Sequence, residues 1–227
     1  LNGTQNKVDN NLVYSNRFNM PMDYTAYSRH VKNNNIEHTI QFDYATKVDK
    51  HNTLDLGLKY IYRLSKNTTE QDYSSKVTTM SSFFNHSTNI AASYVEWNAQ
   101  YWKWNFRPGI RYEFSRLKGF YPKGIGNTYS CSLNDFVPSV NILYKVNDAN
   151  TIQYNYAMSI NRPGINYLNP AVVVQPESKS YGNTKLKSSR SSQMALTWTN
   201  ITSKTTNQMI LAYGFTDNFL TNVDFLT

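Results

Sequence analysis

Charged side chains that could do chemistry recur at alternate positions in several stretches of the chain. Asp55, Lys59 and Arg63 are separated by apolar residues, and a strand would bring such alternating positions to one face. A charged, water-facing wall can contact a passing solute. Alternatively, opposite charges on neighbouring strands pair, which gains a few tenths to about 1 kcal/mol per pair. Both interpretations apply to Asp43, Asp55, Lys59, Arg63, Arg107, Arg111 and Glu113.

Catalytic and metal-binding patterns are not found in the sequence. The histidines His30, His38, His51 and His86 share no metal-ligand spacing, and no motif anchors a Ser/His/Asp set or a carboxylate pair. We therefore expect no enzyme activity, no metal and no cofactor. Cys131 is the single cysteine, so no internal disulfide forms.

Two alternating runs near the N-terminal third predict a β-hairpin. In residues 36–46 the even positions are mostly apolar and the odd ones polar, and the pattern resumes over 54–64 after a short polar turn at 48–51. Each run is about as long as the roughly 9–11 residues of a tilted transmembrane strand. The hairpin therefore predicts a wall with one apolar and one wet face.

Six more strands follow with the same period. The connections between strands alternate between short and long, which is typical of outer-membrane β-barrels with short turns on one rim and long loops on the other. Residues 1–34 are interpreted as a long polar loop region. The expected strands are 89–97, 104–114, 136–144, 152–160, a stretch around 196–198, and 209–215, with short turns at 98–102, 146–150 and 200–205 and long loops at 66–87, 117–133 and 161–189.

Composition agrees with an all-β membrane wall. The chain has 18 Tyr, 11 Phe and 4 Trp among 227 residues, with 17% charged residues, and no apolar run is long enough for a transmembrane helix. The net charge of +8 is scattered rather than clustered, which argues against a nucleic-acid partner. Aromatic residues near strand ends suit the membrane interfaces, namely Tyr60, Tyr62, Tyr101, Trp102, Trp104, Tyr144 and Trp198.

Residues 158–186 contain a more specific pattern. The stretch carries Arg162-Pro163, then Leu168-Asn169-Pro170, then Gly182-Asn183-Thr184-Lys185-Leu186. With Trp104–Glu113 and Leu56–Tyr60, these segments resemble the Bacteroidota outer-membrane β-barrel family, the carboxy-terminal barrels of TonB-dependent receptors and their relatives. Thr184 stands where that family usually has proline, and Ser188-Ser189 replaces its proline-glutamate.

The resemblance implies a fold, a cellular location and a set of partners. It implies an antiparallel up-and-down transmembrane barrel in the bacterial outer membrane, of which about eight strands are present, and uptake of an unidentified solute. The resemblance implies outer-membrane lipid around the barrel and the TonB system as a partner. A surface lipoprotein is a further expected partner. The plug and the coupling segment are expected to be absent, so we interpret residues 1–227 as a barrel fragment or degenerate copy that does not transport by itself.

The long loop at 161–189 carries its own expectations. Arg162, Pro163, Asn169, Pro170, Gly182 and Asn183 are expected to fix the course of the loop, and Tyr167 and Tyr181 could stack on a ligand. Two other functions stay open at this point. One is a passive porin-like channel, and the other is a secreted soluble β-sandwich that binds glycans, in which the apolar faces would be sealed between two sheets.

Overall fold

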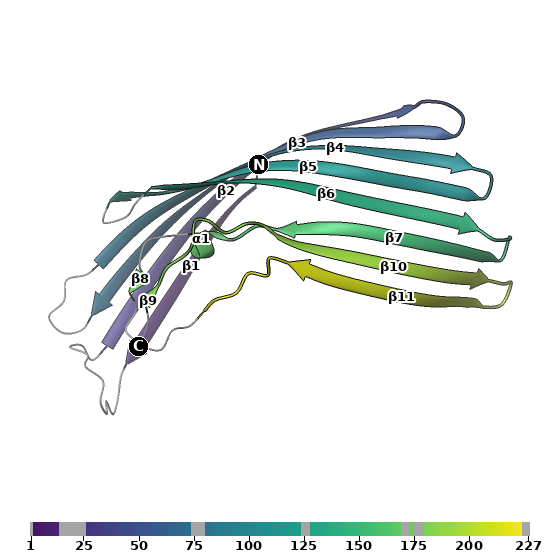
Figure 1. Cartoon of the computed structure of the whole chain (residues 1–227). Helices are drawn as coiled ribbons and strands as arrows, with labels where there is room; N and C mark the ends of the chain where they lie inside the picture. The colour runs from purple at the N-terminus through teal and green to yellow at the C-terminus, as the bar shows by residue number, and fades with distance from the viewer. Residues whose placement is uncertain are drawn as a thin grey trace.

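The protein folds into one long, curved antiparallel sheet (Figure 1). The computed structural model describes residues 2–13, 26–73, 80–123, 128–168, 173–174 and 179–223. The sheet has nine strands, and they follow the chain order from one edge to the other. They are β1 (Asn2–Val13), β2 (Ala26–Lys47), β3 (Asn52–Tyr73), β4 (Met80–Tyr101), β5 (Trp104–Lys123), β6 (Tyr129–Lys145), β7 (Asn150–Asn161), β10 (Ser189–Ile201) and β11 (Thr206–Asp217).

The predicted all-β, up-and-down antiparallel class is confirmed. Every expected strand from 36–46 to 209–215 lies within an observed one, and each neighbouring pair is antiparallel. Among the described strands, β1 and β11 form the two edges, so the sheet is open. This is the geometry of part of a barrel wall.

The short turns all lie at one end of the sheet, as the sequence predicts (Figure 1). Asn and Asp side chains close two of them. Asp49 accepts hydrogen bonds from the backbone N–H groups of His51 and Asn52, at 2.7 and 2.9 Å. Asn147 accepts from the N–H groups of Ala149 and Asn150, at 3.0 and 2.9 Å. Such side chains mimic backbone turns and so fix the register of each hairpin.

Two expected long loops and part of the N-terminal loop region are strands instead. β3 continues to Tyr73 and β4 begins at Met80, so most of 66–87 is an extended hairpin. β5 and β6 likewise take up most of 117–133, and β1 with the start of β2 takes up much of 1–34. Most of these residues are polar on both faces, so they show little alternation, and the start of β6, where Tyr129, Cys131 and Leu133 alternate with polar residues, is the exception. Their backbone ladders nevertheless continue from the hairpins below.

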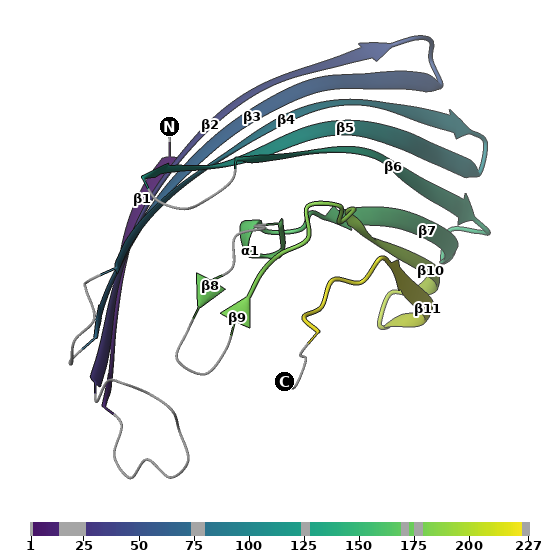
Figure 2. The ribbon, with the colours of Figure 1, turned by 60° about the vertical axis from the view of Figure 1, so that its left-hand side comes forward.

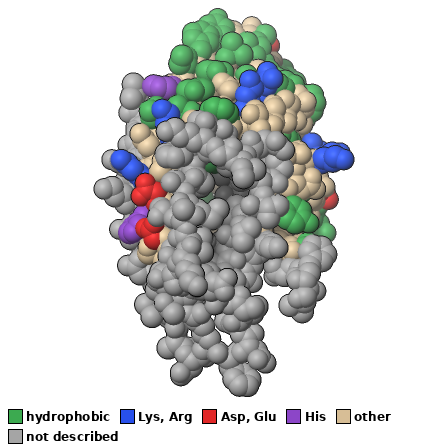
Figure 3. Space-filling model, turned by 90° about the vertical axis from the view of Figure 1, so that its left-hand side faces the viewer, with side chains coloured by type: hydrophobic (Ala, Val, Ile, Leu, Met, Phe, Trp, Pro, Cys, Tyr) green, Lys and Arg blue, Asp and Glu red, His purple; other side chains and the backbone are tan. Residues whose placement is uncertain are grey.

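We call the half of the sheet next to the short turns the lower half, and the other half the upper half. One face of the lower half is apolar, and no other described element covers it. The side chains of Ile40, Leu58 and Leu211 are 72%, 60% and 73% exposed, and no second sheet among the described residues packs on them. Figure 3 shows hydrophobic side chains gathered over the top of the view, on the outer, convex side of the sheet. The apolar face is therefore available to lipid. Within the described ranges, the sealed core that a soluble sandwich needs is not present.

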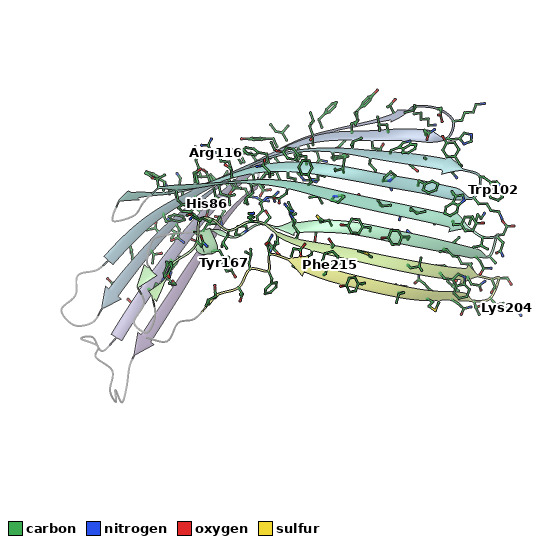
Figure 4. All side chains as sticks on the ribbon, viewed as in Figure 1. His86, Trp102, Arg116, Tyr167, Lys204 and Phe215 are labelled. Carbon is green, nitrogen blue, oxygen red and sulfur yellow. The ribbon has the colours of Figure 1, made fainter. Side chains whose placement is uncertain are left out.

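The rim formed by the short turns is aromatic. Trp102 is 82% exposed, adopts a positive φ of 51° and lies under Lys103 Nζ, which is 5.2 Å from the ring centroid. His51 stacks on Tyr101 with 5.3 Å between ring centroids. Figure 4 shows Trp102 and Lys204 at this same end. Aromatic rings beside cationic side chains suit the boundary between hydrocarbon and water.

The other face, the concave face, carries an inserted segment. We use this name for residues 162–188, whose described parts include α1 (Ile165–Leu168), β8 (Val173–Val174) and β9 (Lys179–Ser180). Figure 2 shows α1, β8 and β9 inside the curve of the sheet. β6 pairs with β7 only from Ser139 to Lys145, so the upper part of β6 is left beside the inserted segment.

Candidate functional site

The strand register places all seven predicted charged residues on the concave face. Asp43 lies opposite Gly57, and Arg63 lies opposite Glu37, so the odd positions of β2 and β3 share one face. The same register continues through β4 into β5, where Arg111 and Glu113 lie on that face. The remaining members of the set on this face are Asp55, Lys59 and Arg107.

Ion pairs and hydrogen bonds link most of these charges to their neighbours. Arg63 Nε lies 2.5 Å from Glu37 Oε2, and Arg107 Nε lies 2.5 Å from Glu96 Oε1. Asp43 accepts hydrogen bonds from Tyr94 Oη and from Gln41 Nε2, both at 2.7 Å. The concave face is therefore organised by cross-strand polar contacts. Contact between these groups and a solute stays a prediction.

Arg162 anchors the beginning of the inserted segment. Its Nε donates a hydrogen bond of 2.7 Å to Ser115 Oγ, and its Nη2 pairs with Glu113, which also pairs with Arg111 at 2.5 Å. Burial lowers the pKa of Arg162, and the positive charges of Arg111 and Arg63 lower it further. The guanidinium stays charged, because an arginine pKa starts far above neutrality. Three arginines thus surround this part of the face.

Apolar packing holds the middle of the inserted segment. Leu168 is fully buried at 0% exposure, at the end of α1. It packs into a cluster with side chains from the upper concave face, with Phe84 and Leu186 at its margin. The other members of this cluster are Leu117, Tyr129, Cys131 and Leu133, and of these only Cys131 was noted from the sequence, without a packing role.

The end of the inserted segment is tied to β6. Ser188 Oγ donates to Asp135 Oδ2 at 2.7 Å, and Arg190 Nη2 lies 3.5 Å from Asp135 Oδ1. Asp135 and Ser188 are both 2% exposed. The loop that the sequence predicts to project from the rim is therefore bound against the concave face at its start, middle and end.

Of the residues expected to fix the course of the loop, the structure describes Arg162, Pro163, Gly182 and Asn183. Pro163 is buried, and the backbone N–H of Asn183 donates to the carbonyl oxygen of Tyr167 at 2.6 Å, which closes the segment on itself. Tyr181 is 70% exposed, whereas Tyr167 is half-buried on the concave side (Figure 4). Gly182 precedes the Asn183 contact. Asn169 and Pro170 lie outside the described residues.

Metal ligands do not gather in the part of the chain that the structure describes. No group of three or more His, Cys, Asp or Glu side chains there could hold a metal ion. In the same residues, no helix is long and apolar enough to cross a membrane.

Comparison with protein families decides the class. A family model described as the outer membrane protein beta-barrel family matches residues 1–226. The chain belongs to this family. A member of this outer membrane β-barrel family lies in the bacterial outer membrane, which agrees with the exposed apolar face. A search of curated proteins found no match.

Solved structures similar to this family member are named as an uptake receptor, a transporter and a siderophore receptor. The ferric yersiniabactin uptake receptor FyuA from Yersinia pestis matches with a TM-score of 0.62 at 14% identity, over 84% of this chain and 30% of that one. The ferric citrate transporter FecA in its unliganded form matches with a TM-score of 0.52 at 15% identity, over 77% and 26%. The siderophore receptor PiuA from Acinetobacter baumannii matches with a TM-score of 0.51 at 8% identity, over 84% and 32%.

These similarities establish the fold and its scale. The chain spans about a quarter to a third of the length of each of these structures. The family and these structures are barrels of the outer membrane, not enzymes, in agreement with the sequence-based expectation.

Proposed function

We propose that the chain forms part of the barrel wall of an outer-membrane receptor that takes up a solute with energy from the TonB system. The observation that carries this proposal is the division of the sheet into an exposed apolar face and a charged concave face. The first suits lipid, and the second suits an aqueous interior through which a solute passes. Similar structures named as a transporter and as an uptake receptor support the same function.

The inserted segment favours a receptor over an open channel. Ion pairs, hydrogen bonds and a buried leucine hold it against the concave face, which narrows the space inside the curve. A porin-like pore passes solutes by diffusion and needs open space. A receptor captures a specific solute and moves it with external energy, so a narrowed interior does not oppose its function.

The test compares depletion of solutes from the growth medium by mass spectrometry, so the solute need not be known in advance. Cells that express the protein are compared with cells in which its gene is deleted, each with and without inactivation of the TonB system. The proposal predicts that the same few solutes stay in the medium when the gene is deleted and when the TonB system is inactivated. A passive channel predicts a broad loss of uptake by solute size on deletion and no effect of TonB inactivation on transport by the protein.

A membrane assay supplies a second readout. We expect the purified chain in detergent to shift its gel mobility on heating, as barrel proteins do when they unfold. In liposomes we expect the chain alone to show no saturable, substrate-specific flux, because coupling to energy requires further parts. Saturable flux by the chain alone would contradict this expectation.

A further inference from the structure

A pocket of about 550 Å³ lies between the start of the inserted segment and the concave face of β2–β4. Its volume falls in the range of small-molecule sites, which is about 300–1,000 Å³. Arg162, Pro163 and Gly164 line one side, and Glu37 and Arg63 line another. It is therefore bounded by both of the elements that form the concave interior.

The charges around this pocket do not balance. Arg63 and Arg162 line it, and Arg111 lies just outside the lining, where it shares Glu113 with Arg162. Among the ion pairs of the described residues, only Glu37 and Glu113 oppose these three arginines. One bound anion with a single negative charge would therefore neutralise this group of charges.

The guanidinium groups retain donors for an anion. Arg63 contacts Glu37 through Nε, and the Arg63 side chain is 51% exposed, so its guanidinium is open to a further partner. Arginine offers five N–H donors in a planar fork that matches a carboxylate. The hydroxyls of Ser65 and Thr88 also line the pocket.

Part of the remaining lining is apolar. Ile90, Leu117 and Pro163 line the same pocket and present no hydrogen-bonding side chain, although Asn35, His86 and Asn161 also line it. Apolar surface next to a cationic group fits a ligand with both characters. A fully polar anion such as phosphate would leave this part of the lining without a complementary surface.

We propose that this pocket binds a small carboxylate with an apolar portion, with the carboxylate between Arg63 and Arg162. The inference deepens the proposed function, on which it rests, by naming the chemical class of the solute. The second hollow of the concave face, about 510 Å³ around Arg107 and Glu96, gives a charge-balanced comparison because its lining contains one arginine and one glutamate.

The experiment measures ligand binding to the detergent-purified protein by isothermal titration calorimetry, with empty micelles as a blank. The probes are benzoate, its neutral analogue benzamide, and inorganic phosphate. We expect benzoate to bind at least tenfold more tightly than benzamide and phosphate. Equal binding of benzoate and benzamide would overturn the inference, as would binding of phosphate without benzoate.

Two substitutions should change benzoate affinity in opposite directions. Arg63→Gln removes a cation and should weaken binding at least tenfold. Glu37→Gln removes the competing carboxylate and should strengthen binding about threefold, the size of effect expected for a partly exposed charge. A misfolded variant cannot bind benzoate more tightly. Stronger binding by the Glu37→Gln variant would therefore show an effect on the site itself rather than a loss of structure.

The matched controls come from the other hollow. Arg107 and Glu96 form a pair with the same 2.5 Å distance, and the exposure of Arg107 is 53% against 51% for Arg63. Arg107→Gln and Glu96→Gln should leave benzoate affinity unchanged. If they alter it as much as the Arg63 and Glu37 variants, the inference fails. Selective uptake without benzoate binding would refute the inference alone. Benzoate binding together with non-selective flux that does not require the TonB system would refute the proposed receptor function alone.

Discussion

Ser188 and Asp135, which lie 53 positions apart in the sequence, are joined by a buried hydrogen bond of 2.7 Å from Ser188 Oγ to Asp135 Oδ2. Arg190 approaches the other oxygen of the same carboxylate at 3.5 Å. A carboxylate that is 2% exposed is costly unless it keeps such partners. This contact therefore fixes the end of the inserted segment to β6.

Ser188→Ala should destabilise the protein by about 1–3 kcal/mol, because it leaves one oxygen of a buried carboxylate without its donor. Urea unfolding in liposomes measures the change. Ser191→Ala is the matched control, since the Ser191 hydroxyl contacts Thr216 Oγ1 at an exposed site at 2.9 Å. Its cost should stay within about 0.5 kcal/mol. Equal losses of unfolding free energy for the two substitutions would show that the buried hydrogen bond contributes no more stability than the exposed one.

Leu168→Ala should cost about 2–5 kcal/mol, because the side chain is fully buried and its removal leaves a cavity. We also expect faster proteolysis within the inserted segment, measured by mass spectrometry of limited digests. Leu168→Met keeps the volume and should cost less than about 1.5 kcal/mol. An unchanged digestion rate in the alanine variant would mean that the segment does not depend on this contact.

Leu58→Arg should impair insertion into lipid by about 2–4 kcal/mol, the cost of arginine on the lipid face near the middle of a barrel wall. Leu58 is 60% exposed on the outer face. The adjacent Lys59→Gln lies on the concave face and should have little effect. Folding yield into liposomes measures both. If the lysine variant fails and the leucine variant inserts, the two faces are assigned the wrong way round.

Gly57→Ala should displace the ring of Tyr94. A Cβ at Gly57 would lie 1.9 Å from Tyr94 Cε1, so the ring must move and its hydrogen bond to Asp43 is lost. We expect a loss of about 1 kcal/mol in unfolding free energy. In a Tyr94→Ala background the same substitution should be neutral or stabilising, since alanine fits a strand better than glycine. A double-mutant cycle without coupling would refute the contact.

The turn at 48–51 should respond to acid. The hydrogen bond from the His51 N–H, then that from the Asn52 side chain, lowers the pKa of Asp49 below its ordinary value. A lowered carboxyl pKa stabilises the fold above the unfolded value of about 3.9 and loses that contribution as pH falls through the folded value. Asp49→Asn should therefore flatten the dependence of the unfolding midpoint on pH below about 4. Asp148→Asn, whose residue makes only an exposed 3.5 Å ion pair, should keep the wild-type dependence.

The lower half of the sheet could be predicted from the sequence because lipid on one side and water on the other impose alternation. Leu54 to Leu64 and Ile152 to Ile160 show this pattern, and both lie within observed strands. The upper half could not, because residues such as Lys66 and Asn67 are polar on either face and resemble a loop. Only their backbone pairing identifies these residues as strands, and the hydropathy of the sequence does not reveal that pairing.

A reversal of apolar parity marks the site that the sequence analysis missed. In β6 the apolar residues from Phe136 to Tyr144 are mostly at even positions, with Val137 and Leu143 as exceptions, but Tyr129, Cys131 and Leu133 are at odd positions. The reversal occurs where the inserted segment covers the concave face. Recognising it would have required treating this stretch as a strand. The contacts of Asp135 and Arg162 involve distant residues and follow only from the fold.

The early end of the β6–β7 pairing at Ser139 has a further consequence. The long strands β2 to β6 extend far beyond the short turns, whereas β7 and β10 end earlier (Figure 1). The edge of the described wall opposite the short turns is therefore stepped, and the inserted segment lies at the step. In the receptor that we propose, a solute that approaches over the shorter strands would meet the inserted segment first.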